Sequence, residues 1–173
     1  SPGMRVWLSG KSMDSLEPER SSSSPSVRIS ELKAEGTGGS VLRVRLDNGS
    51  LFLLDADLPA LPRYHSGDLV NDEDLRLLSA ASEIYSCRQK ALDLIGRSEQ
   101  YRHGLYAKLV SRGFSREAVT AALDRLEAAG SLSDRRYAEV WVRSRLRTRP
   151  EGPVRLKAAL AAKGISSSVA AWA

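Results

Sequence analysis

The arginine-rich segment from Arg135 to Arg149 holds the residues whose type and spacing best suit a chemical task. If this segment is a helix, with about 100° between successive residues, Arg136, Arg143 and Arg147 fall within about 40° of one another. We call these three residues the basic stripe. Guanidinium groups on one helix face donate hydrogen bonds to phosphates or carboxylates. The segment therefore predicts a binding surface for an anionic partner.

Further cations surround the basic stripe. Arg149, Arg155 and Lys157 follow around the next turn, where a merely solvated surface is an equally good interpretation. Arg145 borders the apolar side of the helix and suits a structural role beside a carboxylate. The candidate binding residues for this anionic partner are Arg135, Arg136, Arg143, Arg147, Arg149, Arg155 and Lys157.

The sequence offers no arrangement for catalysis. A nucleophile with its base, a carboxylate pair or a metal cluster is not apparent. We expect His65, in a loop, and His103, on a helix, to lie at the surface or in packing contacts. The Gly36–Gly39 stretch lacks the Lys-Ser/Thr of a phosphate loop and indicates a hairpin turn. The expectation is a protein that is not an enzyme, with no catalytic residue, bound metal or cofactor.

Positive charge is concentrated in the C-terminal half. Residues 1–81 hold 9 Lys+Arg and 12 Asp+Glu, and residues 82–173 hold 17 and 9, which together give the net charge of +5. Such an imbalance attracts polyanions and disfavours the folded state by self-repulsion unless a partner neutralises it. Nucleic acid, single- or double-stranded, is the first expected partner class.

The remaining composition favours a soluble protein of a reducing compartment. Cys87 is the single cysteine, which excludes an internal disulfide, and its place among apolar helix positions indicates packing. No apolar run approaches the ~20 residues needed to span a bilayer. We expect a cytoplasmic monomer that does not bind membranes, with Ser1-Pro2-Gly3 as a remnant of the expression vector.

The first 70 residues divide into a tail and a small β element. The tail is rich in Ser, Pro, Glu and Arg and too polar to order, although Val6-Trp7-Leu8 is a candidate sticky peptide. Further on, Asn48-Gly49 separates two apolar runs, which is the strongest short hairpin signal. We predict two or three antiparallel strands whose apolar face rests on the helices that follow.

From residue 71 onward the sequence predicts one helix after another. Asn71-Asp72-Glu73-Asp74 has the composition of a helix start and opens a linker helix. Apolar residues at helical spacing and N-cap residues then predict helices at 82–95, 102–112, 116–129 and 134–148, one opened by Pro153, and a last short one from Ser166.

The helical part repeats itself after 51 residues. The pattern Leu-x-x-x-Leu-x-x-basic-Gly-apolar-Ser occurs at Leu105–Ser115 and again at Leu156–Ser166. The same shift pairs Cys87, Ala91 and Ile95 with Ala138, Val142 and Leu146. A period that holds three helices indicates three-helix units, each burying part of its surface against the next.

We therefore predict a mostly α protein of tandem three-helix, helix-turn-helix-like repeats preceded by a small antiparallel β element. The expected divisions are the remnant and disordered tail at 1–25, a β-hairpin or sheet region at 26–70, a linker helix and first three-helix repeat at 71–130, and a second, truncated three-helix repeat at 131–173.

Three motifs in the helical part form an ordered set. They are Leu105-x-x-Lys108-Leu109-x-x-x-Gly113-Phe114, then Leu132-Ser133-Asp134-x-x-Tyr137-Ala138, then Gly152-Pro153-x-x-Leu156-x-x-x-Leu160-x-x-Lys163-Gly164-Ile165. Together they resemble the RecX family of RecA recombinase regulators. Gly67-Asp68-Leu69 and the preceding strands extend the likeness to about residues 27–173.

The sequence departs from the family pattern in three respects. Tyr101 stands where the family usually has a small capping Ser or Thr, and Gly104 and Ala159 stand where it favours Glu before Leu. A third repeat is also absent, which shortens any surface that spans a filament.

The resemblance implies a regulator that lodges in the groove of a RecA filament on DNA and acts there as a negative modulator. Such a protein controls recombination, DNA repair and the SOS response, and it makes or breaks no bond. One alternative is a stand-alone helix-turn-helix transcriptional regulator that binds DNA. A second is a protein-interaction adaptor whose arginines serve only solubility.

Overall fold

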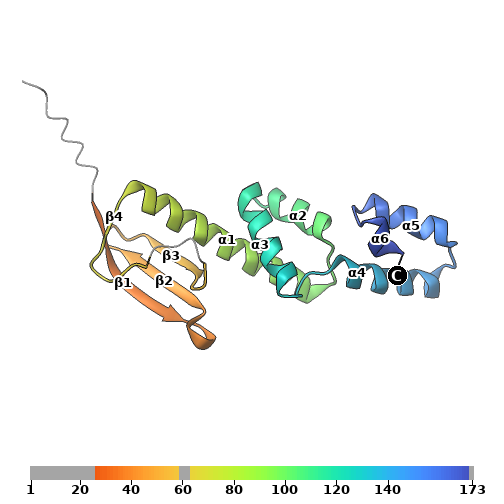
Figure 1. The fold of residues 1–173 in the computed structure, drawn as a ribbon, viewed down its shortest axis with the longest axis horizontal. Coiled ribbons are helices and arrows are strands. Elements are labelled where there is room, and N and C mark those ends of the chain that lie inside the picture. The colour runs from red at the N-terminus through yellow and green to blue at the C-terminus, as the bar shows by residue number, and fades with distance from the viewer. Residues whose placement is uncertain (1–25, 59–62, 172–173) are drawn as a thin grey trace, which may run out of the picture.

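The computed structural model describes residues 26–58 and 63–171 (Figure 1). A sheet lies at one end of the long axis, and the helices follow one another toward the other end. The strands are β1 (Val27–Glu35), β2 (Val41–Leu46), β3 (Leu51–Asp55) and β4 (Leu69–Val70), with a short 3-10 turn η1 (Thr37–Gly39). The helices are α1 (Asp72–Arg97), α2 (Arg102–Ser111), α3 (Arg116–Ala128), α4 (Asp134–Thr148), α5 (Pro153–Ala162) and α6 (Ser167–Ala170). The predicted fold class is confirmed, whereas the predictions for the tail at 1–25, with Ser1-Pro2-Gly3 and Val6-Trp7-Leu8, fall outside the described residues.

The sheet is antiparallel, with the strand order β3-β2-β1-β4. The predicted hairpin at Asn48-Gly49 joins β2 to β3: Gly49 has a φ of 87°, which glycine adopts without side-chain strain, and the Asn48 side-chain oxygen accepts from the Ser50 N–H at 2.9 Å. The Gly36–Gly39 stretch connects β1 to β2, as predicted. The prediction of two or three strands missed β4, because a two-residue strand carries no alternating pattern.

One face of the sheet packs against the first half of α1. Ile29, Leu46 and Leu54 from three strands are buried together with Leu78 and Ala81 of that helix. A small sheet needs such a covering element to be stable in water. The expectation that the sheet rests on the first helix is confirmed.

The helix α1 is continuous over 26 residues, where the sequence analysis expected a linker helix and a separate helix from Ser82. It begins with a capping box, in which Asn71 accepts from the Asp74 N–H at 2.8 Å and Asp74 accepts from the Asn71 N–H at 3.3 Å. No glycine or proline interrupts residues 72–95, so nothing ends the helix between the two predicted segments. The second half of α1 serves as the first helix of the first repeat.

A buried carboxylate ties the end of β3 to two helices. Asp55, 2% exposed, pairs with Arg88 of α1, and its Oδ2 lies 3.8 Å from Nε of Arg125 of α3. We call Asp55, Arg88 and Arg125 the buried clamp. Arg125 also donates to the exposed carboxylate of Asp57 at 2.6 Å, which holds the pKa of Asp57 below its usual value. The clamp fixes the sheet to the first repeat through charge as well as apolar packing.

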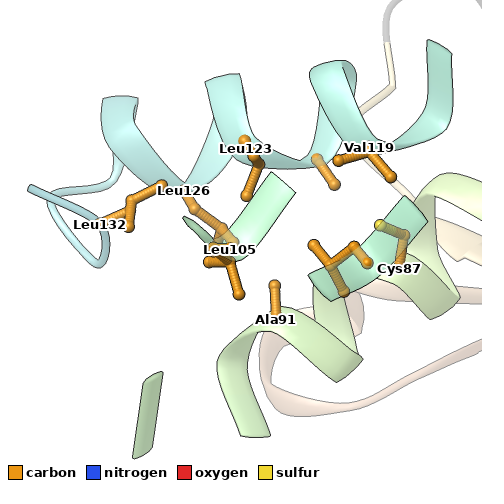
Figure 2. Packing of buried hydrophobic residues seen from close by; sticks show 9 residues of the cluster. Cys87, Ala91, Leu105, Val119, Leu123, Leu126 and Leu132 are labelled. Atoms are coloured by element: carbon orange, nitrogen blue, oxygen red, sulfur yellow. The ribbon is translucent and has the colours of Figure 1, made fainter. Parts of the chain in front are cut away.

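The first repeat encloses an apolar core between α1, α2 and α3 (Figure 2). Leu105, Leu123 and Leu126 are at most 2% exposed. Cys87 lies fully buried in the same core, and burial, followed by the charge of Glu83, raises the pKa of its thiol to about 11. The predicted packing role of Cys87 is confirmed.

The 51-residue shift reproduces the helix boundaries. Helices α2 and α5 have ten residues each and start 51 positions apart. Helices α3 and α6 also start 51 positions apart, at Arg116 and Ser167, and α1 and α4 end 51 apart, at Arg97 and Thr148. The repeat is therefore present in the structure as well as in the sequence, with α6 much shorter than α3 in the described part.

The two repeats meet at a contact of two aromatic rings and a cation, which we call the repeat joint (Tyr101, Tyr137 and Lys163). The two ring centroids are 4.8 Å apart, and Nζ of Lys163 lies 5.0 Å from the Tyr101 centroid and 6.0 Å from that of Tyr137. The first amide of α2, at Arg102, donates to the Asp134 carboxylate of the second repeat at 2.6 Å. Asp134 thus accepts from one of the amides that a helix start leaves without a partner inside the helix, while Tyr101 at the N-cap makes no side-chain cap hydrogen bond and stacks on Tyr137.

Gly104 provides the space for the Tyr101 ring. A Cβ atom at position 104 would lie 2.5 Å from Cζ of Tyr101, far inside van der Waals contact. The departures from the motif pattern at positions 101 and 104 are therefore one paired feature of the repeat joint.

We expect Gly104→Ala to lower the free energy of unfolding by about 1 kcal/mol, because the ring must leave the joint. In a Tyr101→Ser background, Gly104→Ala is expected to raise the free energy of unfolding by about 1 kcal/mol, since alanine is the better helix former once the ring is gone. Urea denaturation of the four proteins measures both effects. The same sign in both backgrounds would contradict the pairing of positions 101 and 104.

Candidate polyanion-binding site

The second repeat is built from α4, α5 and α6 around a small core. Ala138 and Val142 of α4 are buried together with Leu160 of α5. Tyr137 and Trp141 pack against this core, as the sequence predicted. Since these five residues occupy one side of the second repeat, the remaining side of α4 faces solvent.

Arg143 and Arg147 lie on the solvent side of α4, four residues apart and therefore on one helix face. Both are exposed, and within the described residues neither guanidinium group makes a hydrogen bond or an ion pair. Val140, 48% exposed, lies on the same face one turn earlier. We call Arg143 and Arg147 the exposed arginine pair.

The third member of the basic stripe, Arg136, is held inside the chain. Its guanidinium group pairs with Glu99 and donates to the carbonyl oxygens of Gly130 at 2.9 Å and Ser131 at 2.8 Å. The expectation that all three guanidinium groups of the stripe are available does not hold for Arg136. The local sequence carries no signal for this, because Glu99 is 37 positions away and reaches Arg136 only through the packing of the two repeats.

We expect Arg136→Ala to lower the free energy of unfolding by about 1–2 kcal/mol, because it leaves two carbonyl oxygens and a carboxylate without their donors. The matched change Arg143→Ala is expected to cost less than about 0.5 kcal/mol, since that side chain is exposed and unpaired. Urea denaturation of the two variants distinguishes the roles. Equal losses would mean that the contacts of Arg136 contribute nothing to stability.

Two further arginines of α4 are engaged with carboxylates. Arg135 lies 3.1 Å from Glu139 one turn later in the helix. Arg145 lies 3.6 Å from Glu151 and 5.0 Å from the centroid of the Trp141 ring. The predicted pairing of Arg145 with a carboxylate is therefore present in the structure.

The cations after α4 are exposed but do not form one row. Arg149, Arg155 and Lys157 have no side-chain hydrogen bond or ion pair among the described residues. Arg155 and Lys157 are two positions apart in α5, so their side chains leave that helix about 160° apart. The geometry therefore joins Arg143 with Arg147 and distributes the other three around the end of the molecule.

The second repeat carries a surplus of positive charge with no internal counter-charge. Residues 131–171 contain nine Lys+Arg and three Asp+Glu. Each carboxylate is engaged: Asp134 caps α2, Glu139 contacts Arg135 and Glu151 contacts Arg145. Among the described residues, six cations of this repeat have no carboxylate partner. Lys163 lies against the two rings of the repeat joint, and the five exposed ones are Arg143, Arg147, Arg149, Arg155 and Lys157. Such a surface attracts an anionic partner.

The two histidines lie at the surface. The side chain of His65 is 79% exposed, with its Nδ1 3.7 Å from Asp68, and His103 is also exposed. In the part of the chain that the structure covers, His, Cys, Asp and Glu side chains form no group of three suited to a metal ion. None of the helices at 72–171 combines the length and the apolar character that a bilayer crossing requires.

Comparison with known proteins gives a consistent family. A family model described as the second three-helix domain of RecX matches residues 133–173. A protein named "Regulatory protein RecX" from Clostridium perfringens (strain SM101) is 25% identical over 142 residues, which cover 82% of this chain and 66% of that relative. A protein of the same name from Chlorobium phaeobacteroides (strain BS1) is 39% identical over 79 residues, or 46% of this chain and 52% of that relative.

The fold is shared with a solved structure. A crystal structure of regulatory protein RecX superimposes with a TM-score of 0.67 at 21% identity and covers 84% of this chain and 71% of the other. The chain thus spans about half to two thirds of the length of the curated relatives that it matches. The motif set, the repeat and the matches to these relatives agree with one another, and together they support the RecX family for this chain.

Proposed function

We propose that this protein is a negative modulator of the RecA recombinase that binds the RecA–DNA filament and so controls recombination, DNA repair and the SOS response. The observation that carries the proposal is the surplus of five exposed cations on a repeat whose carboxylates are all engaged. The name "Regulatory protein RecX" of the relatives supports a regulatory role.

A protein of this kind acts by occupying a surface and needs no reactive group. Arg143 and Arg147 would face phosphates of the DNA or carboxylates of the filament, where guanidinium groups form charge-assisted hydrogen bonds. Contacts of this type steer association and fix the register of the complex. We place the protein in the cytoplasm, as a monomer, with RecA filaments and DNA as its partners.

The test is RecA-driven ATP hydrolysis and DNA strand exchange, with the protein added from substoichiometric to stoichiometric amounts. Both rates are expected to fall as the protein is added, and a pull-down with filaments is expected to retain it. Unchanged rates at stoichiometric amounts would exclude the proposal. Binding to one duplex site ~10³-fold or more above random DNA would instead support the stand-alone transcriptional regulator.

A further inference from the structure

The second repeat shows which side chains the docking face of a three-helix unit accepts. Its face holds Tyr137 on α4 and Lys163 and Gly164 at the turn before α6, and the start of α2 covers it. Nζ of Lys163 lies 5.0 Å from the centroid of the Tyr101 ring, and a Cβ atom at Gly164 would lie 3.3 Å from Cβ of His103. This face therefore receives an aromatic ring on its cation.

The corresponding face of the first repeat lines a groove of about 420 Å³. Subtracting 51 from positions 137, 163 and 164 gives Ser86, Arg112 and Gly113, and all three line this groove. A Cβ atom at Gly113 would meet nothing within 4 Å apart from its chain neighbours. The tyrosine of the second repeat is replaced here by the small and exposed Ser86. The groove thus has room for a ring where the second repeat already holds one.

Arg112 is the cation that a ring in this groove would cover. Its side chain is exposed, and its guanidinium group donates to the carbonyl oxygen of Lys108 at 2.9 Å. In the part of the chain that the structure describes, Arg112 has neither a carboxylate nor an aromatic ring as a partner, whereas Lys163 has two rings. A guanidinium group attracts the face of an aromatic ring, so an incoming ring has a favourable contact there.

The other walls of the groove suit a peptide that carries such a ring. Leu51 and Phe52 of β3 and Phe114 after α2 give it an apolar surface, and Leu51 is 42% exposed. Strand β3 ends the sheet and pairs only with β2 among the described strands, so its second edge is available to an extended segment. The one carboxylate of the lining, Glu83, accepts from the Ser115 N–H at 2.7 Å and is engaged.

We propose that the groove between β3, α1 and the turn before α3 binds an aromatic side chain from an extended segment of a partner protein. The ring is seated on Arg112, in the space left by Ser86, as the rings of Tyr101 and Tyr137 are seated on Lys163. This contact goes beyond the proposed function, because it assigns a protein partner to the first repeat, whereas the proposed function uses the exposed cations of the second.

The experiment follows the amide and arginine Nε–H signals of the isotope-labelled full chain by NMR while a capped pentapeptide is added. The peptide has tyrosine at its centre and valine and threonine on both sides, since these residues favour an extended backbone. We expect saturable shifts at Ser86, Arg112 and Gly113. The same peptide with serine at its centre is expected to bind about fivefold more weakly or less, because it lacks the ring.

Variants of the protein locate the contact. Arg112→Ala is expected to weaken binding of the tyrosine peptide by about fivefold, and Arg112→Lys to retain most of it, since lysine keeps the charge. The matched control Arg116→Ala, at an exposed position outside the groove lining, is expected to leave binding unchanged. Ser86→Tyr is expected to prevent binding, because the chain's own ring then covers Arg112 as Tyr137 contacts Lys163.

Equal affinity for the two peptides, or an equal loss with Arg112→Ala and Arg116→Ala, would overturn the proposal. So would unchanged binding to the Ser86→Tyr variant. Binding that arises only after Trp7→Ala would assign the groove to the chain's own N-terminal segment, and dimerisation that Arg112→Ala abolishes would assign it to a second copy; either result contradicts a partner segment. The measurement contains neither RecA nor DNA, so its outcome is independent of the test of the proposed function.

Discussion

Replacing Arg143 and Arg147 together by glutamate is expected to weaken binding to the RecA–DNA filament by about 100-fold, equivalent to about 2.8 kcal/mol. Both side chains are exposed, share one face of α4 and have no counter-charge in the described chain. Reversing their charge therefore converts two attractive contacts into two repulsive ones. The change is expected to leave the free energy of unfolding within about 0.5 kcal/mol, because no internal contact is lost.

The matched control is Arg76→Glu with Arg116→Glu, which alters the net charge by the same amount on α1 and α3. Both arginines are exposed, without a side-chain hydrogen bond or ion pair in the described residues. Filament pull-down over a range of salt concentrations measures the two double variants. The α4 variant is expected to show a salt dependence with a slope lower by about two, because two anion contacts are gone. Equal weakening by both variants would mean that only the net charge matters.

Asp55→Asn is expected to lower the free energy of unfolding by about 2–4 kcal/mol. Removing one member of a buried ion cluster leaves the other charges without compensation, which costs about 3–5 kcal/mol when the cluster is fully buried. Asp55 is 2% exposed, whereas the side chains of Arg88 and Arg125 are 25% and 28% exposed, so water reduces the loss. The neutral amide keeps the shape of the side chain and isolates the effect of charge.

Asp57→Asn supplies the control, two positions away on the same segment. Its side chain is 77% exposed, and its ion pair with Arg125 is expected to contribute less than about 1 kcal/mol. Urea denaturation followed by circular dichroism measures both variants. A loss below about 1 kcal/mol for Asp55→Asn would show that the buried clamp contributes no more than a surface ion pair.

Local pattern was sufficient for most of the fold. The helical spacing of apolar residues and the N-cap residues predicted the repeat helices, and the 51-residue shift aligned both repeats to the residue. Asn48-Gly49 predicted the hairpin, because that dipeptide favours the turn by itself. The failures were β4, which is too short for a pattern, and the junction within α1, where two correctly predicted helical segments proved to be one helix.

The candidate site was predicted less completely. The sequence placed Arg143 and Arg147 on one helix face and indicated a structural role for Arg145, since both follow from positions a few residues apart. It did not reveal that Arg136 is bound by Glu99, because that pair depends on contacts across the chain. The divergence of Arg155 and Lys157, in contrast, follows from their spacing of two residues in the helix predicted from Pro153, although the sequence analysis did not use that spacing.

The amino-acid sequence by itself determined the helices, the repeat period, the family motifs and the excess of arginine, because each follows from neighbours within a few turns of helix. Only the tertiary structure decided which cations have a counter-charge, since the partners of Arg136, Arg88 and Arg125 lie 37, 33 and 68 to 70 positions away. It also decided that Tyr101 and Gly104 belong to one contact with the second repeat. Ion pairs and ring contacts between distant segments are fixed by how the helices pack, and no local spacing encodes them.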